Sequence, residues 1–339
     1  MALRLAVAAA LLLLPSAAVS AQSAAVTLQK MDDYPLPGDT SRYDYLSFDP
    51  TTHRMYVAHL GQGVVHVFDT QTKAFVGSVD GIPGVHGVLA VPELGLVYAT
   101  ATSDNTVKVI DPESLAVIAT IPAGDYPDGL AYAPSSRKLY VSDERGGTDT
   151  VIDTATNEVV ATIALGGEAG NTVFDPTSGQ VLVAVQTQNQ IVGIDPARDT
   201  VVALYDTPGC VSPHGLVLDV EHRLAFVGCQ GNAKVAAMDM ETWQVTSLQN
   251  VGLTPDVLIY EPILRMVYVA SEDGTVFVYS EDFLERGNLR FVTNPHAGPN
   301  AHSIGLDTLT RHVYLPTANI LGMPVLREMN LQTLPEPDD

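Results

Sequence analysis

Residues 128–163 read DGLAYAPSSRKLYVSDERGGTDTVIDTATNEVVATI, and this stretch decides the fold. It contains four short runs of apolar and β-branched residues: 129–133, 139–142, a run ending at Asp153, and 159–163. Polar residues, glycine or proline separate each run from the next, which is typical of tight turns between antiparallel strands. A helical repeat would instead space its apolar residues by about 3.6 positions. The stretch therefore predicts a small four-stranded sheet.

The same pattern recurs along the chain. One aromatic or apolar position can be aligned in every copy, and successive copies lie 42, 42, 42, 44, 42 and 46 residues apart. The aligned positions are Tyr56, Tyr98, Tyr140, Leu182, Phe226, Tyr268 and Tyr314. Four short strands per repeat of about 42 residues are the signature of a β-propeller blade. The sequence predicts an all-β, seven-bladed β-propeller that forms a single domain over residues 22–334.

The two ends of the repeat region predict how the ring closes. The last repeat supplies only three strand-like stretches, 302–307, 312–317 and 325–331, whereas an unassigned strand-like stretch, 25–31, precedes the first repeat. Pairing this N-terminal stretch as the fourth strand of the last blade would close the ring and remove an exposed sheet edge. We expect the N-terminal strand to complete the last blade.

Residues 1–21 have the organisation of an export signal. Arg4 supplies a positive charge, residues 5–14 form a short apolar run, and Val19-Ser20-Ala21 is a small-residue cleavage pattern. The apolar run is too short for a membrane span, which needs about 20 residues. We expect cleavage after Ala21, a periplasmic or secreted protein without membrane insertion, and a short acidic tail at 335–339.

The charge balance bears on possible partners. The chain has 39 Asp plus Glu against 17 Lys plus Arg, for a net charge of −22. Nucleic acids and anionic membranes attract basic surfaces, so neither is expected as the main partner. We expect a monomer that takes a small molecule, a metal ion or a protein partner.

Several strands carry a recognisable motif. Residues 55–58 (MYVA), 139–142 (LYVS), 267–270 (VYVA) and 104–111 (DNTVKVID) resemble the YVTN-repeat, YncE-like propeller family. The likeness covers about residues 40–320. It implies a seven-bladed propeller that is often exported, but it implies no single activity, because the motifs are structural and the family is functionally mixed.

Candidate site residues come from the same alignment. Twelve residues before each aligned position lies the start of the innermost strand, which should face the central channel. These positions are Asp44, His86, Asp128, Gly170, His214, Asp256 and His302. Around the ring, three histidines alternate with three aspartates, and Gly170 leaves one gap. The mouth of a propeller channel is the natural place for a site, and burying these groups unpaired would be costly.

A second set of residues should line the same mouth. The second strand of each blade returns beside the first, which predicts His59 near Asp44, Asp143 near Asp128, and Cys229 near His214. Rim positions and an insertion at 286–300 add further candidates: Glu144, Arg145, Glu168, Asn171, Gln230, Glu272, Asp273, His296 and Asn300.

Two chemistries suit such a mouth. His86, His214 and His302 are candidate ligands for a divalent metal ion, with neighbouring aspartates orienting them, as in a metal-dependent hydrolase, lactonase or lyase. Alternatively, pairs of Asp and His could perform acid–base chemistry without a metal. The candidate catalytic residues are Asp44, Asp128, Asp256 and His59. The sequence alone does not choose between these chemistries or identify a substrate.

A non-catalytic alternative explains the same ring. Asp or His at a strand start can simply tie down neighbouring backbone, and an acidic rim would steer cationic ligands or basic proteins towards a binding scaffold. In that case the ring is a structural plug of mutual hydrogen bonds.

The chain has two cysteines, Cys210 and Cys229. Hairpin geometry brings them within bridging range, and an even count in an exported protein fits a disulfide. The bridge would brace the loop that carries His214. A thiolate metal site is the alternative.

Overall fold

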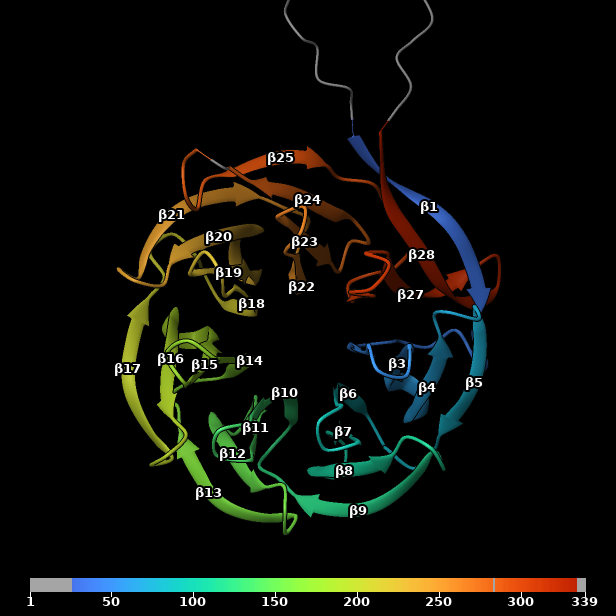
Figure 1. Cartoon of the computed structure of the whole chain (residues 1–339), viewed down its shortest axis with the longest axis horizontal. Helices are drawn as coiled ribbons and strands as arrows, with labels where there is room; N and C mark the ends of the chain where they lie inside the picture. Colours follow the sequence, from blue (N-terminus) through green and yellow to red (C-terminus); the bar gives the residue numbers. More distant parts are fainter. Residues whose placement is uncertain (1–25, 283, 334–339) are drawn as a thin grey trace, which may run out of the picture.

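A computed structural model describes residues 26–282 and 284–333, and nearly all of their regular structure is β-strand. Seven four-stranded antiparallel sheets stand around a central axis (Figure 1). This arrangement confirms the predicted all-β, seven-bladed propeller. The predicted signal peptide (1–21) and acidic tail (335–339) lie outside the described residues.

The first six blades follow one another in chain order, and each runs from its innermost strand to its outermost strand. Blade 1 contains β2 (Leu46–Asp49), β3 (Arg54–His59), β4 (Val64–Asp69) and β5 (Ala74–Val79). Blade 2 contains β6 (Val85–Val91), β7 (Leu96–Ala101), β8 (Thr106–Asp111) and β9 (Ala116–Pro122). Blade 3 contains β10 (Pro127–Ala133), β11 (Lys138–Asp143), β12 (Thr148–Asp153) and β13 (Glu158–Ala164).

The second half of the ring repeats this order. Blade 4 contains β14 (Ala169–Asp175), β15 (Gln180–Val185), β16 (Gln190–Asp195) and β17 (Thr200–Asp206). Blade 5 contains β18 (Pro213–Asp219), β19 (Leu224–Cys229), β20 (Lys234–Asp239) and β21 (Gln244–Asn250). Blade 6 contains β22 (Pro255–Glu261), β23 (Met266–Ser271), β24 (Val276–Glu281) and β25 (Leu289–Thr293). Single turns of 3-10 helix follow β3, β15 and β19: η1 (Leu60–Gln62), η2 (Gln186–Gln188) and η3 (Gln230–Asn232).

Blade 7 is built from both ends of the described chain. Its strands are β26 (Gly305–Leu306), β27 (Val313–Ile320), β28 (Met323–Thr333) and the N-terminal β1 (Val26–Pro35). β1 runs antiparallel to β28 from the Val26–Thr333 pair to the Pro35–Val325 pair. The predicted closure by the N-terminal strand is confirmed, although β1 is longer than the predicted strand and β26 is shorter.

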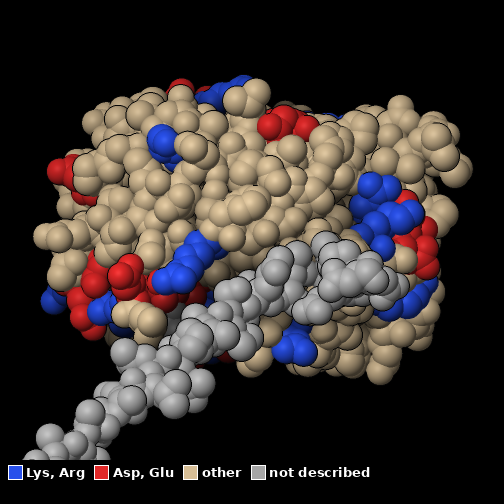
Figure 2. All heavy atoms as spheres, turned by 90° about the horizontal axis from the view of Figure 1, so that it is seen from above, with Lys and Arg blue, Asp and Glu red and all other residues tan. Residues whose placement is uncertain are grey.

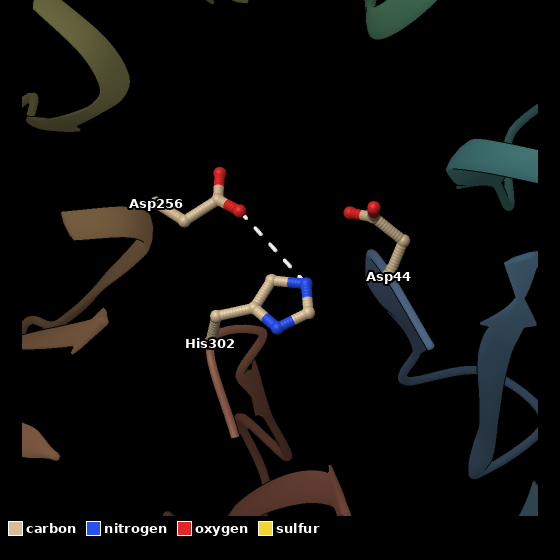
Figure 3. A group of neighbouring side chains, drawn as sticks. All are labelled: Asp44, Asp256 and His302. Carbon is tan, nitrogen blue, oxygen red and sulfur yellow. Dashed lines mark ion pairs between the residues drawn. The ribbon is translucent and has the colours of Figure 1, made fainter. Parts of the chain in front are cut away.

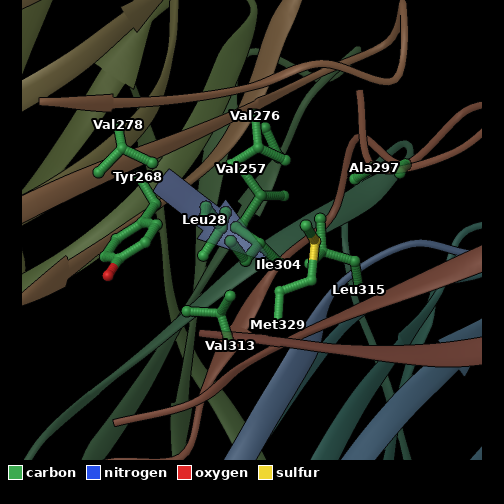
Figure 4. Packing of buried hydrophobic residues seen from close by; sticks show 12 residues of the cluster. Leu28, Val257, Tyr268, Val276, Val278, Ala297, Ile304, Val313, Leu315 and Met329 are labelled. Atoms are coloured by element: carbon green, nitrogen blue, oxygen red, sulfur yellow. The ribbon is translucent and has the colours of Figure 1, made fainter. Parts of the chain in front are cut away.

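The closing strand also contributes to the core. Leu28 of β1 belongs to a buried cluster with Val257 and Val276 of blade 6 and Val313 and Met329 of blade 7 (Figure 4). The seven aligned repeat positions are likewise buried, with at most 1% exposure at each. These positions pack between neighbouring blades, because alternate residues of a strand face opposite sides of its sheet. Burial of apolar side chains between blades therefore holds the ring together.

Some of the many aspartates stabilise the turns that follow the strands. Four aspartates each end a strand and accept a hydrogen bond from the backbone N–H two residues later: Asp49, Asp111, Asp175 and Asp239. Such side-chain turns are a regular use of aspartate. On the wall seen in Figure 2, acidic and basic side chains lie close together with uncharged surface between the groups. Within the described residues, no helix is long and apolar enough to cross a membrane.

Candidate functional site

In five of the seven blades, the ring residue lies in a β-bulge at the start of the innermost strand. In blades 2 to 6, the pairing between the first two strands shifts register at this point. In blade 2 the bulged residues are His86 and Gly87, and the hydroxyl of Thr100 accepts the Gly87 N–H at 2.7 Å. A bulge re-aims a side chain relative to the regular alternation of a strand. The ring residue can therefore turn towards the axis while the neighbouring backbone N–H keeps a partner.

The ring surrounds a polar cavity of about 220 Å³, which we call the axial chamber. It is lined by Arg42, Asp44, Tyr45, His86, Tyr126, Asp128, Glu144, His214, Gln230, Thr254, Asp256 and Glu272. The structure thus brings together five of the predicted ring residues and three of the predicted rim residues. The sixth ionisable ring residue, His302, is 1% exposed and lies 3.9 Å from Asp256.

Four lining residues were missed by the sequence reasoning: Arg42, Tyr45, Tyr126 and Thr254. Three of them, Arg42, Tyr126 and Thr254, stand two positions before a ring residue. In five blades the residue at that place has left-handed backbone, as Tyr126 does with φ of 63°. Counting back fourteen residues instead of twelve from each aligned position would have found this row.

His214 and Asp256 form the closest ion pair between ring residues, with His214 Nε2 3.1 Å from Asp256 Oδ1. Burial alone would lower the pKa of His214, but the hydrogen bond to Asp256 and the charges of Asp256 and Asp128 raise it to about 9. Burial would raise the pKa of Asp256, but His214, His302 and Arg42 hold it below its ordinary value. His214 is therefore a cation at neutral pH, and this nitrogen carries a proton instead of a free lone pair.

His86 has different partners. Its Nδ1–H donates to the Gly84 carbonyl at 2.9 Å, and the Tyr126 hydroxyl lies 3.0 Å from Nε2. Burial lowers the pKa of His86 to about 4, so its imidazole is neutral at pH 7. The Nε2 lone pair accepts the Tyr126 hydroxyl. Both nitrogens of His86 thus have partners. Nδ1 of His214 is buried without a hydrogen-bond partner, but it carries a proton while the imidazole is a cation, so it has no lone pair for a metal ion.

His302 does offer one. Its Nδ1–H donates to the Asn300 carbonyl at 2.9 Å, whereas Nε2 is buried and has no hydrogen-bond partner. Figure 3 shows His302, Asp44 and Asp256 pointing towards one another from three adjacent blades. One ligand atom of each lies within 4.8 Å of the others. A backbone carbonyl on Nδ1 and a free Nε2 are typical of a metal-binding histidine.

Two aspartates of the ring are costly to ionise. Burial raises the pKa of Asp128 to about 7, and its Oδ1 has no hydrogen-bond partner. Burial and the charges of Asp256 and Asp128 raise the pKa of Asp44 well above its ordinary value. Crowding of carboxylates in a buried chamber is electrostatically unfavourable unless cations accompany them.

Arg42, together with His214, is a cation that accompanies them. Its guanidinium lies 2.7 Å from Glu272, 3.6 Å from Asp44 and 3.7 Å from Asp256. Burial opposes its charge, but Asp44, Glu272 and Asp256 raise the pKa of Arg42. Arg42 is the only Lys or Arg that lines the chamber within the described part of the chain. The other arginine of this rim, Arg145, stacks over the Tyr126 ring at 3.8 Å.

The gap in the ring has a steric reason. A Cβ on Gly170 would lie 2.9 Å from the Cα of His214 and 3.0 Å from its Nδ1, so glycine makes room for His214. Next to it, Asn171 accepts a hydrogen bond from Tyr45 across the channel. Tyr45 lines both the axial chamber and a less polar cavity of about 210 Å³ below it. Tyr45, held by Asn171, therefore lies between the two cavities.

His59 lies elsewhere. The backbone of β3 does return beside the ring, since the Asp44 N–H donates to the Ala58 carbonyl. The His59 ring, however, stacks on Tyr43 and bonds Ser41 at 3.0 Å and His66 at 3.1 Å. Asp143 is similarly engaged, with Gly124, Thr148 and Thr150. Strand pairing placed both backbones correctly, but neither side chain lines the chamber.

The predicted disulfide between Cys210 and Cys229 is confirmed, with a Cα–Cα distance of 5.1 Å. Both cysteines are buried. Cys210 precedes β18 and Cys229 ends β19, so the bridge closes the loop that leads into His214. The alternative of a thiolate metal site does not apply to cysteines in this bridge.

A second group of possible metal ligands lies at the far end of β18: Asp219, His222 and Glu281. Its members already have partners. His222 Nδ1 is 2.7 Å from Asp219, Tyr260 donates to Asp219 at 2.6 Å, and Arg265 pairs with Glu281. This group is a satisfied polar network.

Comparison with known proteins supports the fold. No protein-family model and no curated protein matches the chain. A chain of hydrazine synthase from Kuenenia stuttgartiensis matches with a TM-score of 0.74 at 16% identity, covering 88% of this chain and 97% of that chain. A chain of the mitotic checkpoint complex matches with a TM-score of 0.75 at 14% identity, covering 97% and 99%. At these identities the likeness shows the propeller fold alone.

Proposed function

We propose that the protein is an exported propeller whose axial chamber binds one divalent transition metal ion through Asp44, Asp256 and His302. The observation that carries this proposal is the free, buried Nε2 of His302, aimed at two carboxylates from neighbouring blades. An unpaired polar atom in a buried place is costly. Imidazole and carboxylate ligands suit ions such as Mn²⁺ and Zn²⁺.

The surrounding residues favour a small reactive site over a purely structural ion. Glu144, Asp128 and Tyr126 line the same chamber without belonging to the ligand group. A divalent ion held there would polarise a carbonyl or activate water, as in a metal-dependent hydrolase, lactonase or lyase. Asp128, with a pKa of about 7, is suited to exchange a proton with a bound substrate.

Titration of the purified full-length mature protein with Mn²⁺ and Zn²⁺ by calorimetry, after removal of bound ions with a chelator, tests the proposal. We expect one equivalent of metal to bind to the wild type, and Asp256→Asn and His302→Gln to weaken binding at least about tenfold. His222→Gln is the matched control, because it alters the other histidine–carboxylate group. Absence of binding in the wild type, or loss of binding only in His222→Gln, overturns the proposal.

A scaffold role is the second candidate. Ile118 on β9, Val160 on β13 and Leu204 on β17 are 55%, 48% and 60% exposed, on the outermost strands of three successive blades. Scattered exposed apolar residues are common, so we rank this role below metal binding. A protein that binds no metal but is recovered in a stoichiometric complex from its host would favour the scaffold.

Export is part of the proposal. An export signal is cleaved from the mature protein. The disulfide between Cys210 and Cys229 is compatible with an oxidising compartment. Mass spectrometry of the protein expressed in its host is expected to give a chain that begins at residue 22. A mature chain that still begins at Met1 would overturn this part. Membership of the YVTN-repeat family stays an inference from the sequence motifs.

A further inference from the structure

Arg42 and the proposed metal ion compete for the same two carboxylates, those of Asp44 and Asp256. The guanidinium lies 3.6 Å from Asp44 and 3.7 Å from Asp256, which are the two carboxylates of the proposed ligand group. Two positive charges close to the same carboxylates repel each other strongly in a buried chamber. An ion that reaches these ligands therefore has to displace the guanidinium.

The structure also offers a place for Arg42 to go. Its shortest ion pair, 2.7 Å, joins it to Glu272. Glu272 is 28% exposed, compared with 3% for Asp44 and 7% for Asp256, so it lies nearer the solvent. Arg42 itself is 39% exposed and precedes β2 in a segment without regular structure. A long side chain anchored to Glu272 can swing towards the rim without losing all its charge partners.

We infer that Arg42 is an internal counter-cation that occupies the carboxylates of the chamber until a divalent metal ion displaces it towards Glu272. This inference rests on the metal site proposed above and deepens it, because it makes Arg42 a residue that limits metal affinity. Arg42 neutralises the charge of Asp44 and Asp256 in the ion-free protein, and Glu272 retains the guanidinium when the ion is bound.

Metal affinity of a set of variants tests the inference. The probe is Mn²⁺, titrated by calorimetry into wild type, Arg42→Gln, Arg42→Lys and Arg145→Gln. Arg42→Gln is expected to lower the Kd for Mn²⁺ at least about tenfold, because it removes a cation from beside two ligands. The Kd of Arg42→Lys for Mn²⁺ is expected to lie between those of Arg42→Gln and the wild type. Arg145→Gln removes an equal charge from the rim but no ion pair with either ligand, so its Kd should stay within about twofold of the wild type.

Glu272 supplies a second, independent readout. Glu272→Gln is expected to weaken Mn²⁺ binding in the wild-type background, because Arg42 then has only the ligand carboxylates as partners. In the Arg42→Gln background the same change should have a clearly smaller effect. Equal effects in both backgrounds would mean that Glu272 acts only through its charge. Thermal melts of every variant establish that each is folded under the conditions of the titration.

The outcomes separate the two proposals. Suppose that the wild type binds Mn²⁺ and Arg42→Gln binds it no more tightly, or that Arg145→Gln gains as much affinity for Mn²⁺ as Arg42→Gln does. In either case the inference about Arg42 is overturned and the metal site stands. If Arg42→Gln binds Mn²⁺ at least about tenfold more tightly than the wild type and Arg145→Gln does not, the inference about Arg42 is supported. If neither the wild type nor any variant binds Mn²⁺, the metal site is overturned, and the role of Arg42 with it.

Discussion

Replacing Glu328 by glutamine is expected to weaken the closure of the ring at neutral pH and to matter less in acid. Glu328 lies on β28 and is 3% exposed. Its carboxylate accepts hydrogen bonds from Tyr34 of β1 at 2.6 Å and Tyr314 of β27 at 3.0 Å. It also accepts hydrogen bonds from His312 and from Lys73 of blade 1. One buried carboxylate thereby connects the closing strand, the last blade and the first blade.

The pKa of Glu328 determines how much its carboxylate contributes to the free energy of unfolding. Burial alone would raise this pKa, but hydrogen bonds from Lys73, Tyr34 and His312 lower it from 4.5 to about 2. A carboxyl with a lower pKa in the folded state contributes stability that is present above pH 4.5 and is lost as the pH falls towards 2. The contribution to the free energy of unfolding is about 3 kcal/mol at pH 7 and about 1 kcal/mol at pH 3.

Urea denaturation followed by circular dichroism, at pH 7, 5, 4 and 3, measures this contribution. The free-energy difference between wild type and Glu328→Gln should be about 3 kcal/mol at pH 7 and should shrink below pH 4.5. Glu158→Gln, an exposed site on β13, is the matched control and should change stability by less than about 0.5 kcal/mol. A difference that is the same at pH 3 and pH 7, or below about 1 kcal/mol at pH 7, would refute this account of ring closure.

Two further predictions concern the site and its support. Because the pKa of Asp128 is raised to about 7, its ionisation opposes folding and stability is lost as the pH rises from 3.8 to 7. Asp128→Asn should therefore stabilise the fold by up to about 4 kcal/mol at pH 8 and by less than about 2 kcal/mol at pH 5, measured by urea denaturation; equal gains at both pH values would contradict this. Replacing Cys210 and Cys229 together by serine opens a loop with a sequence separation of 19. This double substitution should lower the free energy of unfolding by about 3 kcal/mol. An unchanged urea midpoint would rule out a stabilising bridge.

The backbone plan could be predicted because every blade repeats it. A fixed count within each copy specifies a fixed place in a sheet, and this sufficed for the blade number, the closure by β1 and the positions of Asp44, Asp128 and Asp256 around the axis. The disulfide followed from the same hairpin register. These features depend only on strand pairing, which alternation and turn residues determine locally.

Side-chain contacts within the site could not be predicted in the same way. His59 ends β3 beside the ring, yet its imidazole turns to Ser41 and His66. Arg42 was missed because it lies two positions before the ring residue and reaches carboxylates of blades 1 and 6 through a long side chain. Rotamer choice and side-chain reach depend on neighbours brought together only by the closed ring. The side chains that the closed ring brings within 4.8 Å of one another are accordingly one histidine and two aspartates, whereas the alternation suggested three histidines as ligands.

The position of the ligand group within the ring also has a consequence for stability. Asp256, His302 and Asp44 belong to blades 6, 7 and 1, so the group spans the two junctions on either side of the blade that the N-terminal strand completes. An ion bound by all three would join these blades at the axis. Away from the axis, the Lys73–Glu328 ion pair already joins blades 1 and 7, and the cluster around Leu28 joins blades 6 and 7. A ligand that binds only the folded state stabilises it by mass action. Metal affinity and ring closure are therefore coupled under the proposed function, because opening blade 7 would separate the ligands from one another.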